Sequence, residues 1–317
     1  MRKITLIIVS IIVCFVGLAT SGCNGNLDSA ELPHDGNLNF EEMFPDAEFI
    51  GHFSEGLADI RIDGLWGFID YDGNMIIEPQ FEGTSMFRNG FARFHIFNEN
   101  TVEAMGLIDR YGNIVVPPIY GSIRNFSEGL AAVRVGTWET GLYGFIDREG
   151  NLVIEPQFDS LDYYFSGQSE FSEGRVVMLL DGKYGAIDRY GNVIVPFIHE
   201  EMFAFNEGLA AVKIDELWGF VNLDGSMAIE PQFRFITWRG IFSEGRTRVS
   251  IDGKFGFIDR EGNVVVEPQF DTVEPFRNGM AWVQIGCCAE DNNVSYGRID
   301  RYGNFVVPMR RGSLCEK

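Results

Sequence analysis

Three short patterns recur at similar spacing along this 317-residue chain, and they constrain its fold more than any other feature. The first, F-x-[EN]-G, begins at Phe53, Phe87, Phe126, Phe171, Phe205, Phe242 and Phe276. The second, an aromatic residue and Gly followed by two apolar residues and Asp, begins at Trp66, Tyr143, Tyr184 and Phe255. The copy at Trp218 has Asn222 in place of Asp, the copy at Tyr296 continues as GRID, and Met105 begins a degenerate copy. The third consists of Gly with Asn or Ser, followed by mostly apolar residues and a Pro. It ends at Pro79, Pro117, Pro156, Pro196, Pro231, Pro268 and Pro308. Such self-similarity indicates stacked copies of one structural unit, so the sequence predicts seven units.

One unit, residues 126–158, illustrates the local structure that these patterns predict. Residues 130–135, 143–147 and 151–158 are rich in aromatic and β-branched side chains, which favour extended chain. Turn-forming residues separate the three segments. We therefore expect each unit to be an antiparallel meander of three strands, with a short fourth strand possible in the stretch before the next F-x-[EN]-G.

The turn between the second and third strands of this unit reads D-R-E-G-N. Asp147 can accept backbone hydrogen bonds, and Gly150 can adopt the positive φ that follows a type I turn. In the short units, Asp63-Gly64 and Asp252-Gly253 are typical of two-residue hairpin turns. We interpret the recurring acidic residues at these places as turn residues.

The expected strands are apolar on both faces, which indicates sheets packed against sheets rather than one sheet with a wet face. A closed β-propeller-like ring buries both faces radially, and an open β-solenoid-like stack buries them in a line. The last repeated motif lies at residues 306–309 and is not followed by the linker that follows the other units, whereas residues 42–56 resemble that linker. This favours a closed ring in which the N-terminal segment completes the last unit; the alternative is the open stack.

The repeated motifs resemble those of the bacterial WG-repeat family, named for the Trp-Gly pair that is found here at Trp66-Gly67 and Trp218-Gly219. The resemblance covers residues 42–317 as seven WG-type repeats. It implies an all-β repeat architecture, often on secreted or surface proteins. It implies no reaction.

The N-terminal residues are typical of a secretory signal peptide at 1–22. Arg2 and Lys3 precede a short apolar stretch, and small residues lead to Gly22-Cys23. This end resembles a bacterial lipobox, although Thr20 stands where Leu is commonest. We expect lipidation at Cys23, a flexible tether at 23–41, and a protein exported across the cytoplasmic membrane and held at the cell envelope or surface by its lipid alone.

The net charge limits the type of partner that the protein can bind, and the cysteines indicate a possible disulfide. The net charge of −21 repels phosphate backbones, so we expect no nucleic-acid partner. Cys287, Cys288 and Cys315 follow the tether. Neighbouring cysteines rarely pair with each other, so a disulfide from Cys287 or Cys288 to Cys315 is the sharper hypothesis, with a redox or metal pair as the alternative.

Other acidic residues are weak candidates for a calcium site or a hydrolase active site. The segment 70–74 has the alternating oxygens of a calcium loop, but only one other unit shares its second acid. Acids before Pro recur as Glu78, Glu155, Glu230 and Glu267, whereas an active site is usually built once. The histidines show no metal-ligand spacing, and the usual hydrolase and nucleotide motifs are missing from the sequence. We predict neither catalysis nor a cofactor.

Departures from the repeat are better candidates for function, because insertions into repeat units often line a binding face. The connection between the first two strands is lengthened at residues 98–104, 136–141 and 286–295. The predicted binding residues in such irregular stretches are Trp138, Glu139, Tyr163, Tyr164, Phe165 and Trp238. Aromatic loop residues can anchor a protein or stack on a sugar.

We therefore expect a lipid-anchored, extracytoplasmic repeat scaffold that binds an unknown protein or glycan. Two alternatives remain open at this point. One is an envelope hydrolase with an acidic, possibly calcium-assisted, site. The other is a purely structural spacer at the cell surface.

Overall fold

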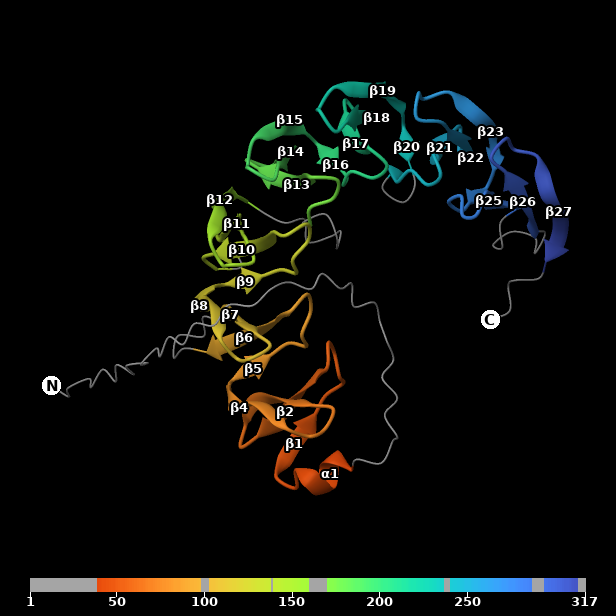
Figure 1. The fold of residues 1–317 in the computed structure, drawn as a ribbon. Coiled ribbons are helices and arrows are strands. Elements are labelled where there is room, and N and C mark those ends of the chain that lie inside the picture. Colours follow the sequence, from red (N-terminus) through yellow and green to blue (C-terminus); the bar gives the residue numbers. More distant parts are fainter. Residues whose placement is uncertain are drawn as a thin grey trace, which may run out of the picture. The chain divides into compact units, whose positions relative to one another are not determined.

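The computed structural model describes residues 39–97, 103–137, 139–159, 170–236, 240–286 and 294–312. The packed unit begins at Phe40, and its only helix among these residues is the short α1 (Phe40–Met43). Everything else regular is β-structure, arranged as seven antiparallel sheets that follow one another along the chain (Figure 1). Within the described ranges, no helix has the length and apolar character needed to span a membrane.

Each sheet is a meander of neighbouring strands. The first three sheets contain β1 (Ala47–Ile50), β2 (Leu57–Ile62), β3 (Leu65–Asp70) and β4 (Met75–Phe81); β5 (Gly83–Thr84), β6 (Phe91–Phe97), β7 (Glu103–Asp109) and β8 (Ile114–Tyr120); and β9 (Ser122–Ile123), β10 (Ala131–Val135), β11 (Leu142–Ile146) and β12 (Leu152–Phe158). The fourth sheet contains β13 (Arg175–Leu180), β14 (Lys183–Asp188) and β15 (Val193–His199).

The last three sheets repeat the four-stranded plan. They contain β16 (Glu201–Met202), β17 (Leu209–Ile214), β18 (Leu217–Asn222) and β19 (Met227–Phe233); β20 (Phe235–Ile236), β21 (Thr247–Ile251), β22 (Lys254–Ile258) and β23 (Val264–Phe270); and β24 (Thr272–Val273), β25 (Met280–Ile285), β26 (Val294–Asp300) and β27 (Phe305–Gly312). The expected all-β repeat of seven units is confirmed, and the short fourth strand is present in six of the seven sheets that the structure describes.

The short strand belongs to the sheet that follows it in the chain. After β4, for example, β5 pairs with β6 through Gly83↔His95 and Thr84↔Phe94. The chain therefore passes from one sheet to the next directly after the proline-containing strand, and the F-x-[EN]-G motif lies inside a unit rather than between two units.

The N-terminal segment completes the first sheet. Strand β1 pairs with β2 through Phe49↔Arg61 and Ile50↔Ile60. The prediction that residues 42–56 would complete the last unit is therefore wrong, because their linker-like sequence forms the first strand of their own sheet. The same segment covers the outer side of this sheet, where Phe40 and Phe44 pack against Ala58, Ile60 and Ile69.

The D-x-x-G-N turn forms as predicted. Asp147 Oδ1 accepts hydrogen bonds from the backbone N–H groups of Glu149 (3.0 Å) and Asn151 (2.8 Å), and the Asn151 side chain donates to Asp147 Oδ2 (2.9 Å). Gly150 has a φ of 84°, which a side chain would disfavour. Burial raises the pKa of the Asp147 carboxyl, but hydrogen bonds from Asn151, Glu149 and Gly150 outweigh it and hold this pKa below 3.8.

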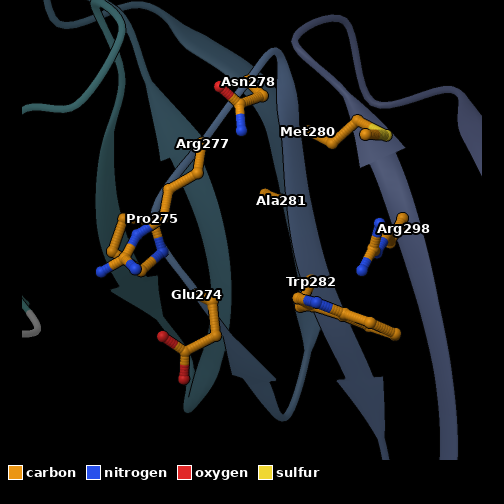
Figure 2. Close-up of a pocket in the computed structure, with 8 residues that line it drawn as sticks. All are labelled: Glu274, Pro275, Arg277, Asn278, Met280, Ala281, Trp282 and Arg298. Atoms are coloured by element: carbon orange, nitrogen blue, oxygen red, sulfur yellow. The ribbon is translucent and has the colours of Figure 1, made fainter.

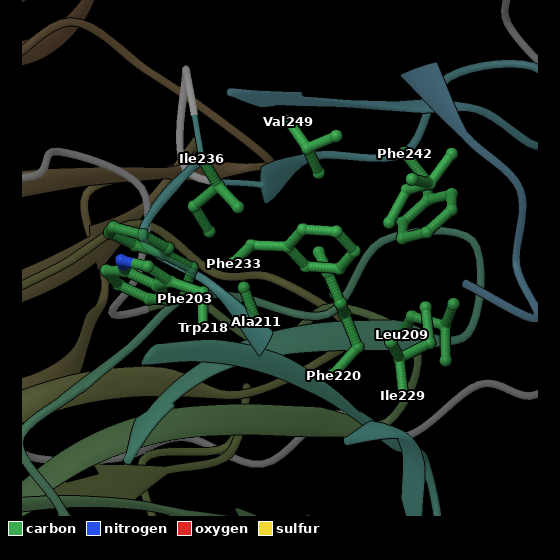
Figure 3. Packing of buried hydrophobic residues seen from close by; sticks show 11 residues of the cluster. Phe203, Leu209, Ala211, Trp218, Phe220, Ile229, Phe233, Ile236, Phe242 and Val249 are labelled. Carbon is green, nitrogen blue, oxygen red and sulfur yellow. The ribbon is translucent and has the colours of Figure 1, made fainter. Parts of the chain in front are cut away.

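Successive sheets share hydrophobic cores. In one such core, Phe203, Leu209, Ala211, Trp218, Phe220, Ile229 and Phe233 of the fifth sheet pack against Ile236, Phe242, Val249 and Ile258 of the sixth (Figure 3). The Trp of the second Trp-Gly pair is part of this core, since Trp218 stacks on Phe203 with ring centroids 5.0 Å apart. We call the side of a sheet that packs against the next sheet its forward face.

The F-x-[EN]-G motif links neighbouring units, a role that the sequence did not indicate. Glu207 accepts hydrogen bonds from the backbone N–H groups of Glu244 (2.8 Å) and Gly245 (2.9 Å) in the next motif. Ser54 likewise donates to the carbonyl oxygen of Phe87 in the following unit (2.8 Å). Equivalent carboxylate–amide links are made by Glu55, Glu128, Glu173 and Glu244.

Candidate functional site

The forward face of the last sheet, β24 to β27, is the candidate functional site, and we call it the terminal face. No strand follows β27 in the part of the chain that the structure describes. Its most prominent side chain is Trp282, which is 45% exposed. Trp282 pairs across the strands with Arg298.

In the other six sheets the second-strand member of this pair is apolar and buried, whereas the first-strand member is charged in three of them, as Asp59, Arg93 and Arg248. The second-strand members there are Phe68, Leu107, Phe145, Ala186, Phe220 and Phe257, none more than 3% exposed. In the last sheet this position is Arg298. A guanidinium at this second-strand position would lose its hydration if another sheet packed on it, so the terminal face lacks the apolar residue that the other six sheets bury there.

A second position on the third strand changes in the same way. Phe81, Tyr120, Phe158, His199, Phe233 and Phe270 are buried in the first six sheets. The last sheet has the exposed Arg310 there, opposite Tyr296. Two large buried residues are thus both replaced by arginine on one face.

Trp282 and Arg298 form a preorganised pair. The Arg298 guanidinium carbon lies 4.3 Å from the centre of the Trp282 ring, a cation–π distance (Figure 2). The contact fixes the orientation of both side chains while leaving much of the Trp surface open to solvent. A fixed aromatic surface loses little conformational entropy when a partner binds.

Two hollows meet at this tryptophan. The first, of about 340 Å³, is lined by Glu274, Pro275, Arg277, Asn278, Met280, Ala281, Trp282 and Arg298 (Figure 2). The second, of about 330 Å³, is lined by Thr272, Val273, Glu274, Trp282, Val283, Gln284 and Tyr296. Both volumes lie in the range of about 300–1,000 Å³ that is usual for binding pockets.

The charge of the terminal face is opposite to that of the protein. Arg277, Arg298 and Arg310 lie on or beside it, with Glu274 as the acidic residue in both hollows. The whole chain has a net charge of −21. A locally basic surface on such an acidic protein favours an acidic partner.

Of the binding residues predicted from sequence, the structure describes only Glu139, which is exposed between β10 and β11. The other predicted residues lie outside the described ranges: Trp138, Tyr163, Tyr164, Phe165, Trp238, Cys23, Cys287, Cys288 and Cys315. The residues of the terminal face were missed, although GRID at residues 297–300, in place of an apolar run, was a usable signal.

The acidic residues that could suggest a calcium site or a hydrolase site each lie in their own turn or sheet. Both carboxylate oxygens of Asp70 accept hydrogen bonds within their own turn, from Asp72 and Asn74. The four acids before Pro are each exposed at the same place in their own sheet: Glu78, Glu155, Glu230 and Glu267. Over the described residues, no three His, Cys, Asp or Glu side chains come together in a way that could hold a metal ion.

Solved structures of low sequence identity resemble the chain. A eukaryotic initiation factor shares 11% identity, with 84% of this chain and 76% of that chain covered and a TM-score of 0.45. AztD from Citrobacter koseri shares 13% identity, with 70% of each chain covered and a TM-score of 0.32. No curated protein matches the sequence.

A family model accounts for most of the repeat region. The model for the WG containing repeat matches residues 48–66, 66–95, 105–136, 143–168, 184–218, 218–255 and 255–286. These segments contain the aromatic-Gly pairs whose side chains enter the cores between sheets. The chain belongs to the WG containing repeat family.

Proposed function

We propose that this protein is an extracytoplasmic binding scaffold, anchored to the membrane by a lipid on Cys23, which captures a protein partner on its terminal face. The observation that carries the proposal is the pair of the exposed Trp282 and the partly buried Arg298, where Arg298 stands at a second-strand position at which six other sheets bury an apolar residue. The scaffold has no catalytic role in this proposal.

The composition of the terminal face supports a protein partner. Tryptophan, tyrosine, methionine and arginine are enriched in protein interfaces, and Trp282, Tyr296, Met280 and Arg298 supply all four. The surrounding arginines favour an acidic protein surface. A glycan remains an outcome of the test, because an exposed tryptophan also stacks on sugars.

The experiment compares variants of the terminal face in crosslinked native cells. We expect Trp282→Ala and Arg298→Glu to lose a co-purifying protein that wild type retains. Tyr302→Ala is the matched control, since Tyr302 is 73% exposed on the same sheet and lies away from both hollows. A glycan-array signal lost with the same two variants would replace the protein by a glycan, and unchanged binding in every assay would overturn the site.

The anchor is tested separately. Cys23→Ser removes the thiol that the lipid would modify, so we expect the variant to leave the membrane fraction. Retention of this variant on the membrane would contradict the lipid anchor without affecting the binding proposal.

We further propose that the seven sheets form an open stack, in place of the closed ring that the sequence favoured. Two observations support this: α1 and the segment after it pack over the outer side of the first sheet, and Arg298 and Arg310 stand on the forward face of the last. Closing the ring would bring these two surfaces together and bury the arginines. Small-angle scattering tests the proposal, since a maximum dimension no larger than that of a compact globule contradicts it.

A further inference from the structure

A second group of positively charged side chains lies at the junction between the second and third sheets. Arg88, Arg93 and Arg124 line one small hollow there, together with the rings of Phe91 and Phe126. We propose that these three arginines form a binding site for an oxyanion, either a phosphate or a carboxylate group. The site is independent of the terminal face and of the function proposed for it.

Arg93 is the fixed element of the site. It lies on the forward face of β6, and its Nη1 donates to the carbonyl oxygen of Ile123 and to Oδ1 of Asn125, both at 3.2 Å. These contacts hold the guanidinium at the base of the hollow. Burial lowers the pKa of Arg93, and the positive charges of Arg124 and Arg88 lower it further.

The repeat provides an internal comparison. Arg248 occupies the equivalent position on β21, and its Nη1 donates to the carbonyl oxygen of Val273 at 3.1 Å. The next residue there is Glu274, whose negative charge opposes the lowering of the Arg248 pKa by burial. At the Arg93 junction the residue after Ile123 is Arg124, so a positive charge stands where the other junction has the negative charge of Glu274.

Among the residues that the structure describes, none of the three arginines has a carboxylate counter-ion. No carboxylate lines the hollow, and no ion pair involving any of the three is found within the described ranges. The nearby Glu55 carboxylate is already engaged by the backbone N–H groups of Asn89 and Gly90. Converging cations without a counter-ion repel one another, and a bound anion removes that repulsion.

The size of the hollow limits what enters it. Its volume is about 20 Å³, which is room for about one water-sized group. One ligand oxygen therefore reaches Arg93, and the rest of the anionic group stays at the mouth between the exposed Arg88 and Arg124. Guanidinium groups bind phosphate and carboxylate oxygens in the same forked geometry, so both classes fit this arrangement.

The test uses the full chain and two probes, inorganic phosphate and benzoate, each titrated at constant ionic strength against chloride. We expect each bound probe to raise Tm, because a ligand that binds only the folded state stabilises it. Arg124→Glu recreates the arrangement at Arg248 and Glu274, and should weaken binding by about tenfold or more. Arg301→Glu, which makes the same charge change on an exposed turn, should bind like wild type.

Each outcome decides the proposal. A response to phosphate alone or benzoate alone identifies the class of oxyanion. Equal Tm shifts in wild type, Arg124→Glu and Arg301→Glu would mean that the salts act on the whole protein, and would overturn the site. If Arg124→Glu does not fold, a selenate soak of wild-type crystals decides instead, since an anomalous peak is expected beside Arg93 and its absence there contradicts the proposal.

Discussion

At the scale of single residues, the motif glutamates act between sheets. Glu55, Glu128, Glu173, Glu207 and Glu244 all have a positive φ, between 49° and 54°, which is unfavourable for a residue with a side chain. Each carboxylate accepts backbone hydrogen bonds from the next motif. The strain is therefore offset by charge-assisted hydrogen bonds that two isolated units could not form.

Removing one such link should destabilise the protein measurably. Glu207→Ala leaves the N–H groups of Glu244 and Gly245 without their carboxylate, so we expect a loss of about 1 kcal/mol in the free energy of unfolding. Denaturant unfolding measures the loss. Glu200→Ala is the control, because Glu200 is exposed outside the motif; equal losses in both variants would contradict the link.

The turn aspartates predict a pH dependence. The pKa of Asp147 is lower in the folded protein than its ordinary value of 3.8, so its stabilising contribution is complete above that value and is lost as pH falls through the folded pKa. Unfolding free energies measured below about pH 4 should therefore fall less steeply for Asp147→Asn than for wild type. Parallel pH profiles for the two proteins would show that the turn hydrogen bonds do not favour the ionised carboxylate.

At the scale of elements, the sequence predicted strands and turns better than their partners. The D-x-x-G-N turn could be predicted because Asp147 and Gly150 act within five residues of each other. The pairing of β1 could not, since the same linker-like sequence could complete either its own sheet or the last one. Short sequence motifs determine local hydrogen bonds, whereas the choice between equivalent partner strands depends on the whole assembly.

The shared cores make neighbouring sheets depend on each other. Phe220 is fully buried between the fifth and sixth sheets, with its ring 5.2 Å from that of Phe242. Phe220→Ala should lower the free energy of unfolding by about 3–5 kcal/mol, because it leaves a cavity in the core that the two sheets share. Phe305→Ala, at a site that is 47% exposed, should cost clearly less in the same denaturant titration; similar losses would mean that the junction is not a packed core.

At the scale of the whole molecule, the two end sheets differ from those between them. The outer side of the first sheet is covered by Phe40, Phe44 and their neighbours. The last sheet instead presents Trp282, Arg298 and Arg310. Sequence comparison between repeats could have found this face, because GRID and the missing third-strand phenylalanine both depart from the pattern.

The most direct measurement places a photo-crosslinking amino acid at position 282 of the full chain on native cells, with position 302 as the control. We predict a crosslink from position 282 to a second polypeptide, lost when Arg298→Glu is added. A crosslink from position 282 only to the first sheet of the same chain would mean that the ring closes over this face. That result, or no crosslink that distinguishes position 282 from position 302, would contradict the terminal face as a partner site.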